Sequence, residues 1–135
     1  MRVFLDTSGI LAVLNANDDY HTSAKKTWRE LLSGNTHLCC NNYVLVESFI
    51  LLQSRFGLEA VRLFQNDILP MLEVDWVNEQ AHSQAVSALL AANRRTLSLV
   101  DCTSFETMRH LGISHVFAFD PHFQEQGFEV IPAAG

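Results

Sequence analysis

The chain has 135 residues, 48% of them hydrophobic, which suits one globular domain with a single core and excludes intrinsic disorder. Its formal net charge of −6 excludes a protein that holds nucleic acid through a strongly basic surface alone. No apolar run reaches the roughly 18 residues of a membrane span, and three cysteines, two of them adjacent, form no disulfide framework, so we expect a cytoplasmic protein without membrane contact.

The first half of the chain predicts alternating strands and helices. Short apolar runs indicate strands, and apolar residues spaced three or four apart indicate helices. Asn41 or Asn42 is suited to cap one helix, and Pro70 ends another. The predicted elements are a strand at 2–5, helices at 8–16 and 20–32, a strand at 37–40, and helices at 42–55 and 58–69.

The second half continues this alternation. Asn78 is expected to cap a helix, and Gly112 to close another. The predicted elements are a strand at 72–77, a helix at 79–92, a strand at 97–100, a helix at 102–111, and strands at 115–119 and 128–132. This order predicts an α/β fold in which residues 1–135 form a single domain, with a short, mainly parallel sheet and helices on both faces.

Three aspartates follow predicted strands at the sheet edge where such folds bind ligands. Asp6 follows the first strand, Asp101 follows the strand at 97–100, and Asp120 follows the strand at 115–119. Each has another interpretation, since aspartate commonly caps helices and Asp120-Pro121 is a strong helix-start signal. Taken singly, capping is the commoner role.

Glu47 is the fourth acidic residue, and it stands in an apolar stretch without a basic residue within one helical turn. On a helix it would share a stripe with Val44, Ile50 and Leu51, which we expect to face the sheet. An unpaired buried charge costs several kcal/mol or more, so Glu47 should have a partner. The alternatives are a protonated or snorkelling glutamate, or an exposed helix face.

These four acids would gather negative charge in one cleft. Such a cluster repels itself and raises the pKa values of its members unless a cation is present. Oxygen ligands select hard divalent ions. The sequence therefore predicts a site for Mg²⁺ or Mn²⁺ made by Asp6, Glu47, Asp101 and Asp120.

Four segments resemble the PIN-domain ribonucleases, and among these the VapC-like toxins: FLDTSGILAVL, YVLVESF, LSLVDCTSF and AFDPHFQEQGFEVI. The resemblance implies metal-dependent hydrolysis of RNA phosphodiesters, a homodimer, and a small VapB-like antitoxin as partner. Asp6, Glu47, Asp101 and Asp120 match the acidic quartet of the family by position. Its supporting polar residues match Thr7 or Ser8, and Ser104.

Other functions remain as alternatives. Phosphatases of the haloacid dehalogenase type need a second acid two residues after the first, and Ser8 occupies that position. Response-regulator receivers need a late lysine, but none follows Lys26. A PIN nuclease of RNA processing that is not a toxin, and a PIN-like module that only binds protein or RNA, both stay open.

The remaining polar residues support smaller predictions. The six histidines show no metal-ligand spacing, and we interpret His21 and His122 as surface or packing residues. The cysteines are expected to be buried thiols. Basic residues cluster on two predicted helices, where they could touch phosphates, although such charges are commonly just solvated. They are Lys25, Lys26, Arg29, Arg94 and Arg95.

Overall fold

The computed structural model of the chain describes residues 1–133, which form one α/β domain. Its strands are β1 (Arg2–Leu5), β2 (His37–Asn41), β3 (Leu72–Asp75), β4 (His115–Phe117) and β5 (Glu129–Ile131). Its helices are α1 (Thr7–Leu14), α2 (His21–Ser33), α3 (Asn42–Phe56), α4 (Leu58–Leu63), α5 (Glu79–Ala92), α6 (Leu99–Leu111) and α7 (His122–Glu125). None of these helices is long and apolar enough to cross a membrane.

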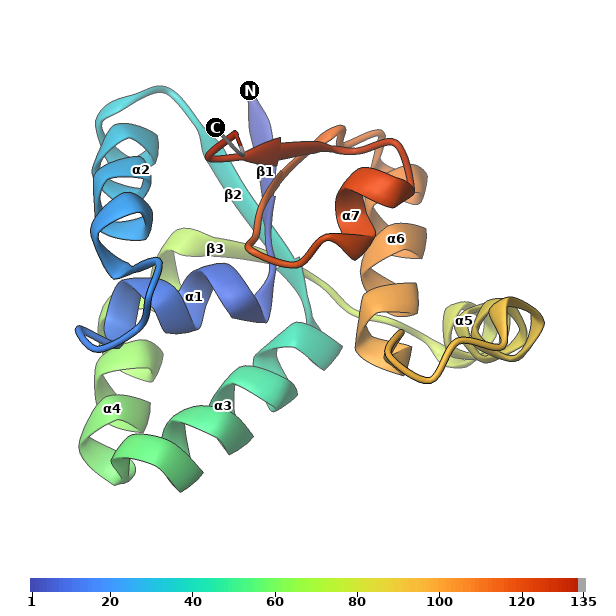
Figure 1. The fold of residues 1–135 in the computed structure, drawn as a ribbon, viewed down its shortest axis with the longest axis horizontal. Helices are drawn as coiled ribbons and strands as arrows, with labels where there is room; N and C mark the ends of the chain where they lie inside the picture. The colour runs from blue at the N-terminus through green and yellow to red at the C-terminus, as the bar shows by residue number, and fades with distance from the viewer. Residues whose placement is uncertain (134–135) are drawn as a thin grey trace.

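The strands form a parallel sheet, as predicted, and their order across it is β3-β2-β1-β4-β5. The chain leaves the central β1 toward β2 and β3, then returns to the other side of β1 for β4 and β5. Figure 1 shows α1 to α4 on one side of the twisted sheet and α5 to α7 on the other. The order reverses between β1 and β4, and a fold of this kind binds ligands beyond the carboxyl ends of such strands.

The central strand is buried on both faces, because helices cover both. Val3, Phe4 and Leu5 are fully buried, which explains why this strand is a continuous apolar run rather than an alternating one. Helix α1 approaches the end of β4 closely at Gly9, where an added Cβ would lie 2.7 Å from the Phe117 carbonyl oxygen. Glycine at this position therefore allows the start of α1 to pack against the end of β4.

Asn41 links the start of α3 to α6. Its Oδ1 accepts a hydrogen bond from the Val44 backbone N–H at 2.9 Å, which caps α3. Its Nδ2 donates to the hydroxyls of Thr103 and Thr107 on α6, at 3.3 and 3.1 Å. The side chain is fully buried, and this network fixes α6 against the carboxyl end of β2.

The predicted strand at 97–100 is wrong, because α6 already begins at Leu99. Ser98 caps this helix and forms a reciprocal capping box with Asp101, so LSLV contains a helix start instead of a strand end. Other boundaries shift less: the helix predicted at 58–69 changes after Leu63 into a π-helical turn at Phe64–Ile68 and a 3₁₀ turn at Leu69–Met71.

The expectation that Glu47 lies on a buried stripe with Ile50 is also wrong. The buried residues of α3 are Val44, Leu45, Ser48 and Leu52. Ile50 is 58% exposed, and Glu47 is half-buried. Because the helical period turns Glu47 away from the centre of the buried face, its carboxylate needs no partner within the core.

Candidate metal centre

Asp6 is held where β1 passes into α1. Its backbone N–H donates to the Phe117 carbonyl at 3.1 Å, which continues the pairing of β1 with β4. Its Oδ2 accepts hydrogen bonds from the Ser8 backbone N–H at 3.2 Å and from the Ser8 hydroxyl at 2.5 Å. Asp6 is only 4% exposed, and it is the N-cap of α1. The capping interpretation is therefore right for Asp6, without excluding a second role.

Asp101 lies in the first turn of α6. The Ser98 hydroxyl accepts from the Asp101 backbone N–H at 3.0 Å, and Asp101 Oδ2 accepts from the Ser98 backbone N–H at 3.2 Å. This capping box fixes the orientation of the carboxylate, which is 7% exposed. Asp101 thus reaches the site from a helix start rather than from a strand end.

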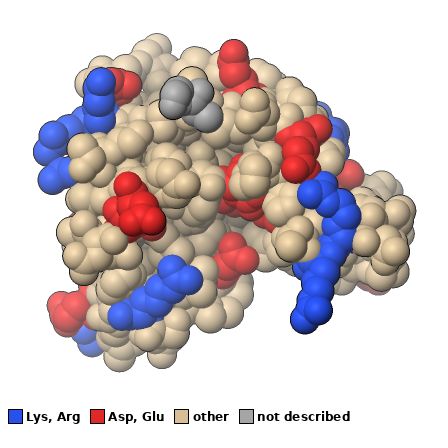
Figure 2. Space-filling model, viewed as in Figure 1, with Lys and Arg blue, Asp and Glu red and all other residues tan. Residues whose placement is uncertain are grey.

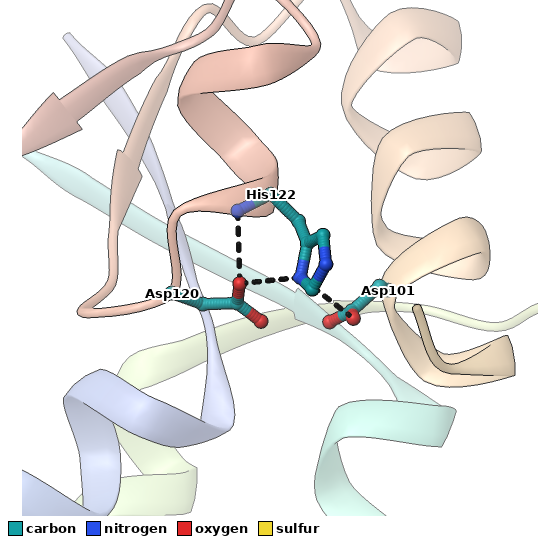
Figure 3. A group of neighbouring side chains, drawn as sticks. All are labelled: Asp101, Asp120 and His122. Carbon is teal, nitrogen blue, oxygen red and sulfur yellow. Dashed lines mark hydrogen bonds and ion pairs between the residues drawn. The ribbon is translucent and has the colours of Figure 1, made fainter. Parts of the chain in front are cut away.

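Asp120, in the turn before α7, pairs with His122, the first residue of that helix. Asp120 Oδ1 accepts from the His122 backbone N–H at 2.9 Å and lies 2.7 Å from His122 Nδ1. The same Nδ1 is 3.7 Å from Asp101 Oδ2, so the imidazole ring lies beside both carboxylates (Figure 3). A ligand atom from each of these three residues falls within 4.8 Å of the others.

Each of the three aspartates uses only one oxygen for these contacts. Oδ2 of Asp6, Oδ2 of Asp101 and Oδ1 of Asp120 accept hydrogen bonds, whereas no protein group in residues 1–133 donates to the other oxygen of each. No side-chain oxygen in this part of the chain is both fully buried and without a hydrogen bond, so the three free oxygens retain access to solvent. They are available to a ligand.

The pKa values of Asp6 and Asp101 are both raised, because these carboxyls are buried and lie near other carboxylates. The pKa of Asp6 is raised to about 7, chiefly by burial and also by the charges of Asp101 and Asp120, against the hydrogen bonds from Ser8. Burial also raises the pKa of Asp101 to about 6, assisted by Asp120, while Ser98 and His122 oppose the shift. The aspartates therefore resist ionising together unless a cation joins them.

Glu47 lies apart from these three acids. It lines an open groove of about 400 Å³ on α3 together with Tyr43, Ile50 and Val100. Val100, the α6 residue directly before Asp101, lines the same groove as Glu47. The structure thus clusters Asp101 and Asp120 with His122, places Asp6 near enough to interact electrostatically with both carboxylates, and places Glu47 on a groove of α3.

The predicted supporting residues have different positions. Ser8 hydrogen-bonds directly to a carboxylate of the site, as described above. Thr7 is buried, and its hydroxyl accepts from Ser48 of α3 at 3.5 Å. The Ser104 hydroxyl is turned back to the Val100 carbonyl at 3.0 Å, so it stabilises α6 rather than touching a carboxylate.

His122 is the residue that the sequence interpretation missed. It is 9% exposed and pairs with carboxylates, so it is neither a surface residue nor a simple packing residue. A signal exists in the sequence: proline between Asp120 and His122 fixes a tight turn that directs both side chains toward one point. Asp120 and His122 are two residues apart, whereas residues on one face of a helix are three or four apart. A search for helical ligand spacing therefore misses this pair.

The donor set fits a hard divalent cation. The carboxylates of Asp101 and Asp120 lie with the His122 imidazole in one group of possible ligands, and Asp6 is near enough for both carboxylates to raise its pKa. Carboxylate oxygens suit Mg²⁺ or Mn²⁺, and the imidazole nitrogen is more compatible with Mn²⁺ than with Ca²⁺. The raised pKa values of Asp6 and Asp101 show that the residues present would gain from such an ion. In Figure 2 acidic side chains lie in a central hollow, with basic side chains on either side of it.

Comparisons with known proteins agree with this architecture. A model of the PIN domain matches residues 3–129. Over 132 residues the chain is 36% identical to the 23S rRNA-specific endonuclease VapC20 of Mycobacterium tuberculosis, covering 96% of this chain and 98% of that protein. The crystal structure of VapC20, described as a Sarcin-Ricin loop cleaving toxin, matches with a TM-score of 0.79 and 33% identity over 93% of this chain and 95% of that one.

More distant structures share the fold. FitAcB from Neisseria gonorrhoeae matches with a TM-score of 0.69 and 15% identity, covering 96% of both chains. VapBC2 from Rickettsia felis, bound to a DNA fragment from the promoter, matches with a TM-score of 0.70 and 13% identity over 96% of this chain and 97% of that one. The match of the family model to residues 3–129, together with the similarity to VapC20, shows that this chain belongs to the PIN domain family.

Proposed function

We propose that this protein is a metal-dependent endoribonuclease and the toxin of a VapBC-type pair. The observation that carries the proposal is the cluster of Asp101, Asp120 and His122, whose possible ligand atoms lie within 4.8 Å of one another, with Asp6 near enough for both carboxylates to raise its pKa. The similarity to VapC20, an rRNA-specific endonuclease, supports RNA as the substrate class. Ribosomal RNA is accordingly the first substrate to test.

The residues of the chain would divide the work of holding one or two Mg²⁺ or Mn²⁺ ions. Asp6, Asp101 and Asp120 would bind through their free oxygens, while Ser8 and His122 keep two of these carboxylates in fixed orientations. A bound ion lowers the pKa of a coordinated water and offsets charge on the phosphate. No side chain is needed as a nucleophile.

Glu47 would act from the border of this centre. Its position on the groove suits a carboxylate that orients a water or contacts the ion through one. Thr7 and Ser104 would support the site indirectly, by fixing α1 and α6.

The family also motivates proposals about partners and location. We propose a small VapB-like antitoxin as partner, a homodimer, and a cytoplasmic protein. The description of VapC20 as a toxin supports the first of these. Coexpression with the product of a short reading frame directly upstream, followed by size-exclusion chromatography, tests both the partner and the dimer.

Cleavage of ribosomal RNA by the purified chain, with Mn²⁺ and with EDTA, tests the activity. The informative variant is Asp101→Asn, because asparagine keeps an oxygen for the Ser98 N–H and should preserve the capping box. The matched control is Asp67→Asn, an exposed acid on the π-helical turn. We expect cleavage by the parent and by the control, and none with Asp101→Asn or EDTA.

Three results would redirect the assignment. Equal cleavage by Asp101→Asn and the parent would remove the aspartates from the chemistry. Binding of RNA and Mn²⁺ without cleavage would favour a non-catalytic binding module. Cleavage of other cellular RNA, with ribosomal RNA untouched, would favour a nuclease of RNA processing.

A further inference from the structure

Two stacked aromatic residues, Tyr20 and Phe119, form a partly exposed aromatic step beside the acidic cluster. Tyr20, directly before α2, stacks on Phe119 with ring centroids 4.7 Å apart and an angle of 13° between the planes. Tyr20 nevertheless remains 53% exposed. One face of its ring is therefore used for the stack, and much of the residue stays open to solvent. Phe119 in turn contacts the ring of Phe117 edge-on, which anchors the step in the core.

The tyrosine is held in place by its own turn. The Asp18 carboxylate accepts from the Tyr20 backbone N–H at 2.8 Å, and the Asp18 carbonyl accepts from the His21 N–H at 3.0 Å. The imidazole Nδ1 of His21 lies 2.8 Å from the Ala12 carbonyl of α1. These contacts present the ring in a fixed orientation, so that little entropy is lost when a ligand stacks on it.

Short connections join this step to the candidate metal centre. Phe119 directly precedes Asp120. The Phe119 backbone N–H donates to the Ser8 hydroxyl at 2.9 Å, and this hydroxyl donates to Asp6 Oδ2 at 2.5 Å. The aromatic pair is therefore bound to the same framework that orients two of the aspartates.

The charge around the step indicates which ligand it suits. Helix α2 begins at the residue after Tyr20 and carries three exposed basic residues, and basic side chains gather over this helix in Figure 2. They are Lys25, Lys26 and Arg29. A flat apolar ring between acids that suit a cation and a basic helix matches single-stranded RNA, whose bases stack on aromatic side chains while its phosphates contact cations.

We propose that Tyr20 is a stacking platform for a nucleobase of single-stranded RNA next to the phosphate that is cleaved. The proposal deepens the proposed ribonuclease function and rests on it for the choice of RNA. Stacking requires the ring and not the hydroxyl. An apolar side chain of a protein partner could also pack on this ring. RNA binding differs from that case, because it should depend on the bases of the strand.

Fluorescence anisotropy with a labelled single-stranded oligoribonucleotide, and with an abasic strand of equal length, tests this role. Binding is measured with Mn²⁺ in the Asp101→Asn background, which should prevent cleavage. Tyr20→Ala should weaken binding of the base-bearing strand by about five-fold to a hundred-fold, since one stacked base contributes on that scale. Tyr20→Phe should bind within about two-fold of the parent. The abasic strand should not distinguish the variants.

A matched control and a second readout separate stacking from structural damage. Phe56→Ala removes another partly exposed aromatic residue, at the far end of the α3 helix, and should leave binding unchanged. In the otherwise native chain Tyr20→Ala should raise KM for RNA, and its stabilisation by Mn²⁺ should equal that of the parent. Loss of the Mn²⁺ response in Tyr20→Ala would show a structural role and overturn the proposal.

The outcomes also separate this proposal from the ribonuclease assignment. Cleavage with equal KM in the parent and Tyr20→Ala, or an equal loss of binding for the abasic strand, would overturn stacking and leave the activity standing. Base-dependent binding through Tyr20 without cleavage by the native chain would overturn the activity and leave stacking standing. Failure of the parent to bind RNA would overturn both.

Discussion

Replacing Asp6 with asparagine tests whether the empty cluster destabilises the fold. In the folded chain the pKa of this carboxyl is raised from 3.8 to about 7, chiefly because the group is buried and in part because of the neighbouring carboxylates. Because the folded value is the higher one, the contribution to stability is fully present below about pH 4 and is lost as pH rises to about 7. At about 1.4 kcal/mol per pKa unit, ionised Asp6 destabilises the metal-free fold by up to about 4 kcal/mol.

Asparagine has nearly the same shape but carries no charge. Its side-chain oxygen can still accept from the Ser8 backbone N–H and hydroxyl, so the cap of α1 should survive. Without metal at about pH 8, Asp6→Asn should therefore be more stable than the parent by roughly 2–4 kcal/mol. For a domain of this size that corresponds to an increase in Tm of about 7–14 °C. Near pH 4 the parent carboxyl is protonated, and the difference should nearly vanish.

Thermal unfolding by circular dichroism in EDTA, at about pH 4 and about pH 8, measures this difference. Added Mn²⁺ should then raise the Tm of the parent but not that of Asp6→Asn, since the ion stabilises only a folded state that binds it. Asp67→Asn is the control for the change in net charge from −6. A variant less stable than the parent at pH 8 in EDTA, or an equal gain at both pH values, would refute the reasoning.

Other perturbations probe the same framework. Mn²⁺ affinity should rise with pH through about 6 to 7, because burial raises the pKa of Asp101 to about 6 and of Asp6 to about 7 and the ion must displace their protons; a pH-independent affinity in calorimetry would contradict this. His122→Ala should weaken Mn²⁺ binding about 10–100-fold by releasing the carboxylate it orients, and unchanged affinity would remove that role. Gly9→Ala should lower the free energy of unfolding in urea by about 1–3 kcal/mol through its clash with Phe117, and an unchanged midpoint would show that α1 shifts freely.

The sequence pattern was sufficient for the sheet and for most helices, because buried parallel strands are short apolar runs between helical repeats. It failed at residues 97–100, where four residues cannot distinguish a strand from a helix start by periodicity alone. The capping signal was nevertheless present, since Ser98 stands three residues before Asp101. A helix start carries its own side-chain chemistry, and here that chemistry was better evidence than apolar character.

The candidate site was predictable where topology alone brings residues together. Asp6 and Asp120 follow neighbouring parallel strands, so their proximity follows from the fold. Glu47 could not be placed, because apolar residues surround it on several faces of α3 and composition does not say which face is buried. Ile50 beside it proves largely exposed. The part played by His122 depends on a turn geometry that no repeating pattern reports.

All three clustered aspartates also fasten the beginning of a helix or turn. Asp6 caps α1, Asp101 completes the capping box of α6, and Asp120 accepts from the first residue of α7. A single ion bound to them would therefore connect the start of the chain, at Asp6, with two segments of its last third, at Asp101 and Asp120, as a reversible cross-link. Its arrival should slow amide exchange and proteolysis in all three segments at once, so that the loaded protein opens as a whole rather than piece by piece.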